Sequence, residues 1–156
     1  MLHAYQLEPI YINDEIYGAH PYDKIDTNPI QIKGEQNEQP KITVIIPAFN
    51  SESGISVALR SLIKQTWTNL EIIVVDDCSP DNTANVVKEW MQKDDRITLL
   101  QTETNSGPYV ARNIALNQAS GEFVTINDAD DWSHPQKNRN SSTPLDRKSI
   151  HFRQYI

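Results

Sequence analysis

The sequence predicts an α/β fold with a mainly parallel sheet that helices cover on both faces. Four short, β-branched apolar runs alternate with amphipathic stretches: ITVIIPAF (42–49), LEIIVVD (70–76), ITLLQ (97–101) and EFVTIN (122–127). Runs of this length and composition are typical of buried strands, and strands that alternate with helices are typical of parallel sheets. The 156 residues are enough for about one ordinary domain.

Three amphipathic segments between these strands predict helices. The first spans about residues 54–66, the second starts in SPDNT (79–83), and the third follows SGP (106–108). At the start of the second helix, Ser79 can act as the cap and Pro80 can take the first helical position. Each segment has apolar residues at helical spacing: Ile55, Leu59, Leu62 and Ile63 in the first, Val86, Val87, Trp90 and Met91 in the second, and Val110, Ala111, Ile114 and Ala115 in the third.

Two flanking segments lack this alternation, so the predicted division is 1–40, 41–136 and 137–156. Residues 1–40 carry seven acidic and two basic side chains without a sustained period. They are predicted to be an acidic extension, either loosely ordered or docking its tyrosines elsewhere. Residues 137–156 carry five basic and one acidic side chain. This atypical basic tail is predicted to be an ordinary polar chain end or the result of a truncation or frame change.

Charge and cysteine content exclude several classes of function. The formal net charge is −7, which disfavours nucleic acid and anionic membrane surfaces as partners. Cys78 is the only cysteine, so neither an intrachain disulfide nor a cysteine-based zinc site can form. A reducing, cytoplasmic location is therefore expected. No apolar run approaches the roughly 18–20 residues of a membrane span.

Polar residues follow three of the predicted strands, at the carboxyl ends where open parallel sheets bind ligands. PAFN (47–50) ends the first strand, Asp76 and Asp77 end the second, and NDADD (127–131) ends the fourth. These groups are expected to converge on one edge of the sheet. A simpler role is available for some acids, because Asp76 and Asp81 can cap the helix that follows.

Asp128, Asp130 and Asp131 are crowded into four positions. Carboxylates this close repel one another unless a cation neutralises them. A hard divalent ion, Mg²⁺ or Mn²⁺, would do so and would leave coordination positions for phosphate oxygens. An EF-hand calcium loop is excluded, because Ser133 and Arg139 occupy the positions that require glycine and glutamate. An ordinary acidic surface turn remains the alternative.

In order along the chain, ITVIIPAFN, SLIKQTWTNLEIIVVDDCSPDNT and NSGPYVARNIALNQASGEFVTINDADD closely resemble the nucleotide-binding half of family 2 glycosyltransferases. The resemblance covers about residues 41–136. It implies a Rossmann-like GT-A domain, incomplete at its C-terminus, that binds a nucleotide-diphosphate sugar, commonly a UDP-sugar. It also implies inverting transfer of the sugar to a hydroxyl of a glycan or other acceptor, as in polysaccharide synthesis.

The resemblance also implies roles for single residues. Asp128-Ala129-Asp130 matches the DXD motif of the family, in which Asp128 would approach the ribose or the metal and Asp130 would bind the Mn²⁺ or Mg²⁺ that bridges the diphosphate. Arg112 matches a donor-site arginine, although a structural arginine at a helix start is the alternative. Asp77 would accept a hydrogen bond from the base. The residues that would border the nucleoside are Pro47, Ala48, Phe49 and Asn50.

A general base cannot be assigned from the sequence. In this family the base and most of the acceptor pocket lie well after the DXD motif, and the residues that follow it here resemble none of those later motifs. His134 and His151 are not assigned as the base, because a lone histidine in a polar stretch is usually a bystander. Two alternatives therefore stay open: a module that binds a nucleotide sugar without turnover, and, less favoured, a receiver-like phosphoacceptor domain built on the strand that ends in Asp76 and Asp77.

Overall fold

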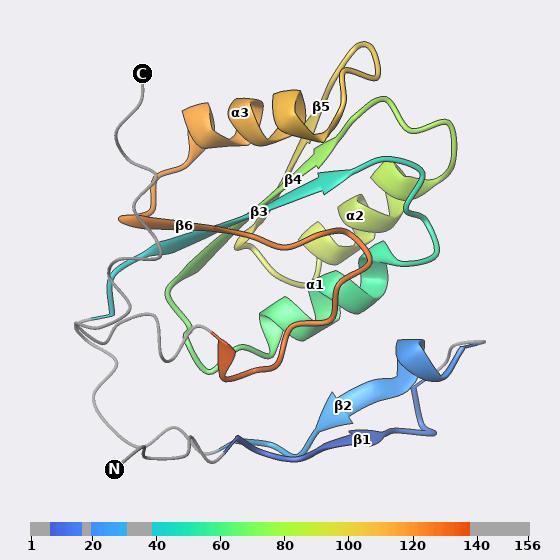
Figure 1. The fold of residues 1–156 in the computed structure, drawn as a ribbon, viewed down its shortest axis with the longest axis vertical. Helices are drawn as coiled ribbons and strands as arrows, with labels where there is room; N and C mark the ends of the chain where they lie inside the picture. Colours follow the sequence, from blue (N-terminus) through green and yellow to red (C-terminus); the bar gives the residue numbers. More distant parts are fainter. Residues whose placement is uncertain (1–6, 17–19, 31–38, 138–156) are drawn as a thin grey trace.

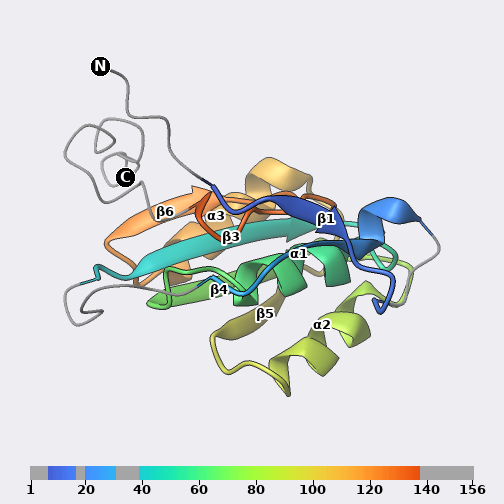
Figure 2. The ribbon, with the colours of Figure 1, turned by 90° about the horizontal axis from the view of Figure 1, so that it is seen from below.

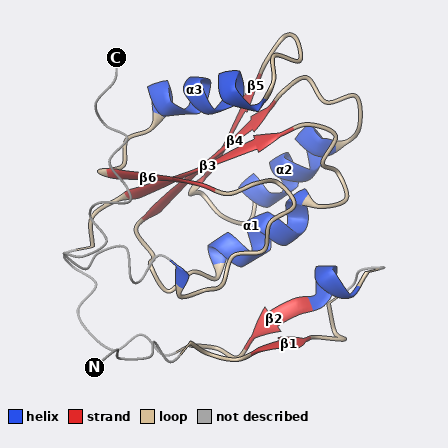
Figure 3. Cartoon of the chain, viewed as in Figure 1, coloured by secondary structure: helices blue, strands red, loops and turns tan. Residues whose placement is uncertain are grey.

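The structure is a computed structural model that describes residues 7–16, 20–30 and 39–137. It is built around a parallel β-sheet with helices on both faces (Figures 1 and 3). None of the helices within these ranges is long and apolar enough to cross a membrane. Apart from Lys137, the predicted polar tail lies outside the described residues.

The strands of this sheet are β3 (Ile42–Ala48), β4 (Leu70–Asp76), β5 (Ile97–Gln101) and β6 (Phe123–Ile126). Their spatial order is β5-β4-β3-β6, and every neighbouring pair is parallel. Each predicted strand is confirmed to within one residue at either end. Because Ala48 pairs with Asp76, the two central strands finish at the same edge of the sheet.

Three helices cover the sheet: α1 (Ile55–Ile63), α2 (Thr83–Met91) and α3 (Pro108–Gln118). Figures 1 and 2 show α1 and α2 on one face and α3 on the other. Two apolar cores result, since Val44 of β3 packs in the core with α1 and α2, whereas Ile45 packs in the core with α3. The predicted α/β architecture with both faces covered is confirmed.

The predicted apolar stripe of α1 is also confirmed. Ile55, Leu59 and Leu62 are buried, and Ile63 packs at the margin of the same core. Full burial of an aliphatic side chain of this size contributes about 1.5–3 kcal/mol. The stripe therefore fixes α1, and with it the loop that joins β3 to this helix.

The start of α2 differs from the prediction. The helix begins at Thr83 rather than at Pro80, and the Ser79 hydroxyl is not its cap. That hydroxyl instead accepts a hydrogen bond from the Asn50 N–H in the neighbouring loop (3.0 Å). The Asp81 carboxylate accepts the N–H of Thr83 (3.1 Å), so Asp81 does serve the helix start.

The apolar face of α2 is narrower than predicted. Val87 is fully buried, and Val86 and Trp90 pack at the core margin. The Trp90 indole N–H donates to the Ser56 hydroxyl of α1 (3.0 Å). Trp90 thus closes this end of the core, and Met91, which was predicted to be buried, is 37% exposed.

The residues before β3 contain regular structure that their sequence did not predict. β1 (Ile10–Ile12) and β2 (Ile25–Thr27) form an antiparallel pair, with the short 3-10 helix η1 (Pro21–Lys24) between them. We call β1, η1 and β2 the N-terminal strand pair. It lies beside α1 in both ribbon views (Figures 1 and 2), where the Lys64 ammonium forms an ion pair with the buried Asp26 carboxylate (2.8 Å).

Candidate functional site

The loops that follow β3, β4 and β6 meet at the carboxyl edge of the sheet, as predicted. They enclose a narrow hollow of about 200 Å³ and a wider, more open hollow of about 520 Å³. Both share the walls formed by Pro47, Phe49 and Pro108. The narrow hollow is also lined by Ala48, Asp77, Asn105 and Gly107. The open hollow is also lined by Asn50, Ser51, Ser53, Gly54, Arg112, Asp128, Ala129 and Asp130.

All seven residues predicted to bind substrate, together with the predicted metal ligand Asp130, therefore line one of two adjoining hollows. The topology explains this convergence, because parallel neighbours bring their carboxyl ends to one edge. Asp131, the third acid of the cluster, lines neither hollow. Its N–H donates to the Asp128 carbonyl (3.0 Å), which closes a turn over residues 128–131 that we call the acidic turn. The surface-turn interpretation thus holds for Asp131.

The backbone at two of the strand ends is held in an unusual conformation. Asn50 after β3 has φ 52° and Cys78 after β4 has φ 58°, both in the left-handed region that non-glycine residues rarely adopt. Hydrogen bonds between the two loops hold them there, from the Asn50 N–H to Ser79 and from the Ser51 N–H to the Thr83 hydroxyl (2.8 Å). The loop that carries Phe49 is therefore fixed, while the Phe49 side chain stays 48% exposed.

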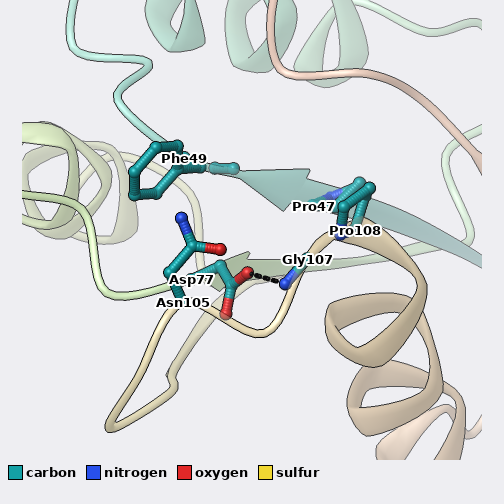
Figure 4. A pocket seen from close by; sticks show the side chains of 7 residues that line it. Pro47, Phe49, Asp77, Asn105, Gly107 and Pro108 are labelled. Atoms are coloured by element: carbon teal, nitrogen blue, oxygen red, sulfur yellow. Dashed lines mark hydrogen bonds between the residues drawn. The ribbon is translucent and has the colours of Figure 1, made fainter.

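Asp77 lies at the back of the narrow hollow and is only 3% exposed (Figure 4). Its carboxylate accepts hydrogen bonds from the N–H groups of Ser106 (3.0 Å) and Gly107 (2.6 Å) and from the Thr102 hydroxyl (2.7 Å). Burial raises the pKa of Asp77, but these three donors outweigh burial, so the net pKa lies below its usual value. Asp77 is thus an ionised anchor for the loop that opens α3.

Gly107 is the point where that loop turns into α3. Its φ of 88° is favourable for glycine alone, and Pro108 follows at the first helical position. Figure 4 shows Pro108 and Pro47 on one side of the narrow hollow, with Phe49 apart from them and Asp77 between the loops. The narrow hollow is thus a slot with apolar walls and a carboxylate at its back. A slot of this kind suits a flat ring that has polar groups on its edge.

The open hollow brings two carboxylates and one guanidinium group together. Asp128 and Asp130 are exposed, while Ala129 between them is buried and packs into the core. The Arg112 guanidinium donates to the Asp128 carboxylate (3.1 Å). The Arg112 Nε is buried and has no hydrogen-bond partner among the described residues. The Arg112 guanidinium, which lines the open hollow, is a group suited to an anionic ligand.

Asn127 supports the acidic turn from inside, a role that was not predicted from the sequence. It is 1% exposed, and its side-chain amide donates to the carbonyls of Asp128 (3.0 Å) and Asp131 (3.2 Å). Its side-chain oxygen accepts from the Ser133 hydroxyl (2.5 Å). The signal in the sequence was the amide that separates the apolar FVTI from the acids, because a buried amide needs partners for all its polar atoms.

The donor set fits a cation that is held jointly with a ligand. No three His, Cys, Asp or Glu side chains converge on a common point in the part of the chain that the structure describes. An all-protein cage is thus not formed there. Two exposed carboxylates beside an open hollow do fit Mg²⁺ or Mn²⁺, which are commonly bound by one or two carboxylates together with substrate phosphates.

His134 is not available as a base. Its Nδ1 accepts the Gln136 N–H (3.1 Å), so the proton sits on Nε2, which faces the Glu8 carbonyl oxygen at 2.9 Å. Both ring nitrogens are therefore used in structural hydrogen bonds. His151 lies outside the described residues.

Comparison with known proteins identifies the family. Residues 43–140 match the sequence profile of Glycosyl transferase family 2. Over 92 residues the chain is 46% identical to the glycosyltransferase GlyA of Streptococcus pneumoniae, which covers 59% of this chain and 13% of GlyA. Over 109 residues it is 42% identical to the poly(ribitol-phosphate) beta-N-acetylglucosaminyltransferase TarS of Staphylococcus aureus, covering 68% of this chain and 19% of TarS. The chain thus spans well under half the length of these relatives.

Solved structures agree. TarS 1–349 in complex with UDP-GlcNAc superposes with a TM-score of 0.64 at 36% identity, over 74% of this chain and 37% of that one. The mannosyltransferase PcManGT of Pyrobaculum calidifontis, in complex with GDP-Man and Mn²⁺, superposes with a TM-score of 0.62 at 29% identity, over 75% and 36%. With a parallel sheet, covered faces and a family profile that matches most of its length, the chain belongs to glycosyl transferase family 2 and has the GT-A fold.

Proposed function

We propose that the chain binds a nucleotide-diphosphate sugar together with a divalent cation, and takes part in inverting transfer of the sugar to an acceptor hydroxyl. The observation that carries this proposal is the open hollow, where Asp128, Asp130 and Arg112 share walls with Pro47 and Phe49. An anion-binding group, two cation-binding groups and an aromatic wall are the features that a nucleotide diphosphate requires. Family membership removes the support for the phosphoacceptor alternative.

The nucleoside is assigned to the narrow hollow. The exposed Phe49 ring can stack on a base, and Asp77 lies at the back of the slot. Uridine is the first candidate, because TarS is seen with UDP and with UDP-GlcNAc. Guanosine is the second, because PcManGT is seen with GDP-Man. The Asp77 oxygens already accept three hydrogen bonds, so Asp77 would contact the base in addition to anchoring its loop.

The diphosphate is assigned to the open hollow, between the acidic turn and Arg112. Asp130 is the main candidate ligand for Mn²⁺ or Mg²⁺, with Asp128 as the second. When bound, the cation would supply Lewis-acid stabilisation of the departing diphosphate. Arg112, which lines this hollow, would add a charge-assisted hydrogen bond from its guanidinium. The acceptor is proposed to be a glycan or another hydroxyl compound, and a cytoplasmic location remains a prediction.

Binding without turnover is the second candidate function. It is favoured by one observation, namely that His134, the histidine nearest to the acidic turn in sequence, has both ring nitrogens occupied. No other described side chain is assigned as a general base. Under this alternative the chain would hold the donor, and the proton acceptor would be missing.

Calorimetry and an activity assay separate these candidates. We expect UDP to bind in the presence of Mn²⁺ and to bind more weakly when EDTA replaces the metal, with GDP and CDP as base controls. Hydrolysis or transfer of the sugar from UDP-GlcNAc would then establish turnover, whereas binding without product would favour the second candidate. Absence of binding to all nucleotides, by a protein shown to be folded, would refute both.

A further inference from the structure

We propose that Tyr22 of the N-terminal strand pair is a positioning residue of the cation site, whose hydroxyl holds the acidic turn so that Asp130 stays at the wall of the open hollow. This inference rests on the proposed function, since it concerns the same cation. It assigns to the first part of the chain a role in donor binding, although residues 1–40 lie outside the region that matches the family.

Two hydrogen bonds carry the inference. The Tyr22 hydroxyl donates to the Asp130 carbonyl oxygen (2.7 Å) and accepts the N–H of Trp132 (2.5 Å). A single phenol therefore bridges the backbone on both sides of Asp131. Both backbone groups have the Tyr22 hydroxyl as their hydrogen-bond partner, and the Asp130 carboxylate makes no hydrogen bond to any described residue. Tyr22 thus fixes the backbone of Asp130 and leaves its carboxylate free for a ligand.

The acidic turn is held from two sides. Asn127 binds it from the protein interior, and Tyr22 binds it from outside through the N-terminal strand pair. Without the phenol, the Asp130 carbonyl and the Trp132 N–H lose their partner, and the acidic turn keeps only the bonds from Asn127 and the bond within the turn. A carboxylate on a less restrained backbone must be ordered when the cation binds, and this cost lowers affinity.

Tyr22 is itself held in place. Its N–H donates to His20 Nδ1 (3.2 Å) within η1, and the Arg60 guanidinium of α1 donates to the carbonyl of the adjacent Asp23. Three residues after Asp23, Asp26 is paired with Lys64, which directly follows α1. The phenol is therefore attached to the rigid α1 helix through short connections.

A second contact ties the same regions together. Glu8, which precedes β1, donates its N–H to the Gln136 side chain (2.8 Å) and receives the His134 Nε2 on its carbonyl (2.9 Å). The segment before the N-terminal strand pair thus contacts the residues that come after the acidic turn in sequence. These contacts show that the first part of the chain is held near the acidic turn by more than Tyr22 alone.

The test compares Tyr22→Phe with Tyr11→Phe. Both variants remove one phenol oxygen from the N-terminal strand pair, but the Tyr11 hydroxyl makes no hydrogen bond to any residue in the described ranges. We expect Tyr22→Phe to raise the Kd for UDP in the presence of Mn²⁺ about tenfold, as for other residues that orient a metal ligand. In EDTA its Kd should change less than about twofold, because the nucleoside walls are untouched. Tyr11→Phe should match the wild type under both conditions.

Each outcome decides between the proposals. If the wild type fails to bind UDP with Mn²⁺, the proposed function fails and this inference fails with it. If the wild type binds and Tyr22→Phe binds as tightly, or loses the same factor with and without metal, the positioning role alone is refuted. Amide exchange at Trp132, measured by NMR, should be faster in Tyr22→Phe; unchanged exchange would also refute the role. If Tyr22→Phe does not fold, Arg60→Met, which loosens η1 from α1, is expected to give the same metal-dependent loss.

Discussion

The two ends of the parallel sheet contain similar charged groups and use them differently. At the amino end, the Glu71 carboxylate accepts hydrogen bonds from the Thr43 hydroxyl (2.5 Å), the Ser120 N–H (2.9 Å) and hydroxyl (2.7 Å), and the Lys41 ammonium (3.2 Å). At the carboxyl end, Asp130 is exposed and its carboxylate has no protein partner within the described ranges. The Glu71 carboxylate is thus hydrogen-bonded by protein groups at both oxygens, whereas the Asp130 carboxylate has no hydrogen bond from a described residue.

The different surroundings of Glu71 and Asp130 indicate that the first acid serves stability and the second serves ligand binding. Burial raises the pKa of Glu71, but its hydrogen bonds from Thr43, Ser120 and Lys41 outweigh burial and bring the pKa to about 2. The folded state therefore strongly favours this charge, which ties β3, β4 and the turn before β6 together. An acid with free oxygens beside a hollow gains nothing comparable from folding. Changes at the amino end should reduce stability and leave affinity unchanged, whereas changes at the carboxyl end should reduce affinity.

The largest effect is expected from Asp130→Asn. Loss of the proposed main carboxylate ligand should weaken UDP binding in Mn²⁺ by about 100-fold, or roughly 2.7 kcal/mol. The free energy of unfolding should change by less than about 0.5 kcal/mol, because the side chain is exposed. Asp131→Asn is the matched control: it removes the same charge one residue away, outside both hollows, and should weaken binding by less than about threefold. Equal losses in both variants would mean that net charge, and not ligation, matters.

Gly121→Ala should give the next largest effect, at the opposite end. A Cβ built there would lie 2.6 Å from the Thr43 nitrogen and 2.9 Å from the Lys41 carbonyl oxygen, so the turn before β6 must move away from β3. We expect a loss of about 2 kcal/mol in unfolding free energy, measured by urea denaturation.

A second glycine provides the comparison. At Gly107 an added Cβ meets no atom within 4 Å, but the φ of 88° is unfavourable for alanine. Gly107→Ala should cost about 1 kcal/mol and, unlike Gly121→Ala, should weaken UDP binding. If Gly121→Ala also weakens UDP binding by the folded protein, the two ends are coupled and the separation proposed above is wrong.

The charge on Glu71 makes stability depend on pH in a predictable direction. Its folded pKa of about 2 lies below the ordinary value of 4.5, so its contribution is complete above about pH 4.5 and is lost as the pH falls towards 2. Between about pH 6 and pH 3 the wild type should lose about 1.5 kcal/mol more stability than Glu71→Gln does. Parallel pH profiles for the two proteins would contradict this assignment.

Lys41→Met should have the smallest effect. Although Lys41 carries the charge opposite Glu71, its side chain is 41% exposed and the pair is screened by solvent. We expect a loss of about 0.5 kcal/mol, measured by thermal unfolding. A loss close to that of Glu71→Gln would show that the ion pair, and not the Thr43 and Ser120 hydrogen bonds, holds the amino end together.

The sequence predicted the sheet and the meeting of the strand-end residues at its carboxyl edge, because both follow from local patterns and topology. Buried strands such as Ile42–Ala48 have continuous β-branched runs, and parallel neighbours must bring their polar ends together. The start of α2 was predicted wrongly, since Ser79 binds a loop 29 residues away instead of its own helix. β1 was missed because its three residues, Ile10 to Ile12, are all exposed and show no alternation.

Two further properties of the site depend on distant contacts that no local pattern contains. Asp77 was predicted to face a base, but its burial and its three donors depend on the loop before α3. Asn127 was assigned no role, because its function appears only when the acidic turn folds back over it. Residue types at strand ends indicate which groups meet; the partners that hold them must be seen in three dimensions.

The bond from Tyr22 to Asp130 also has a consequence for the order of folding. It joins residues 108 positions apart, and contacts of such long range form late because they close a large loop. The sheet can therefore assemble before the acidic turn takes its final conformation. By the same reasoning, the N-terminal strand pair should detach at a lower free energy than global unfolding requires. In that partly open state β3, β4 and β5 would stay folded while the affinity for the cation fell.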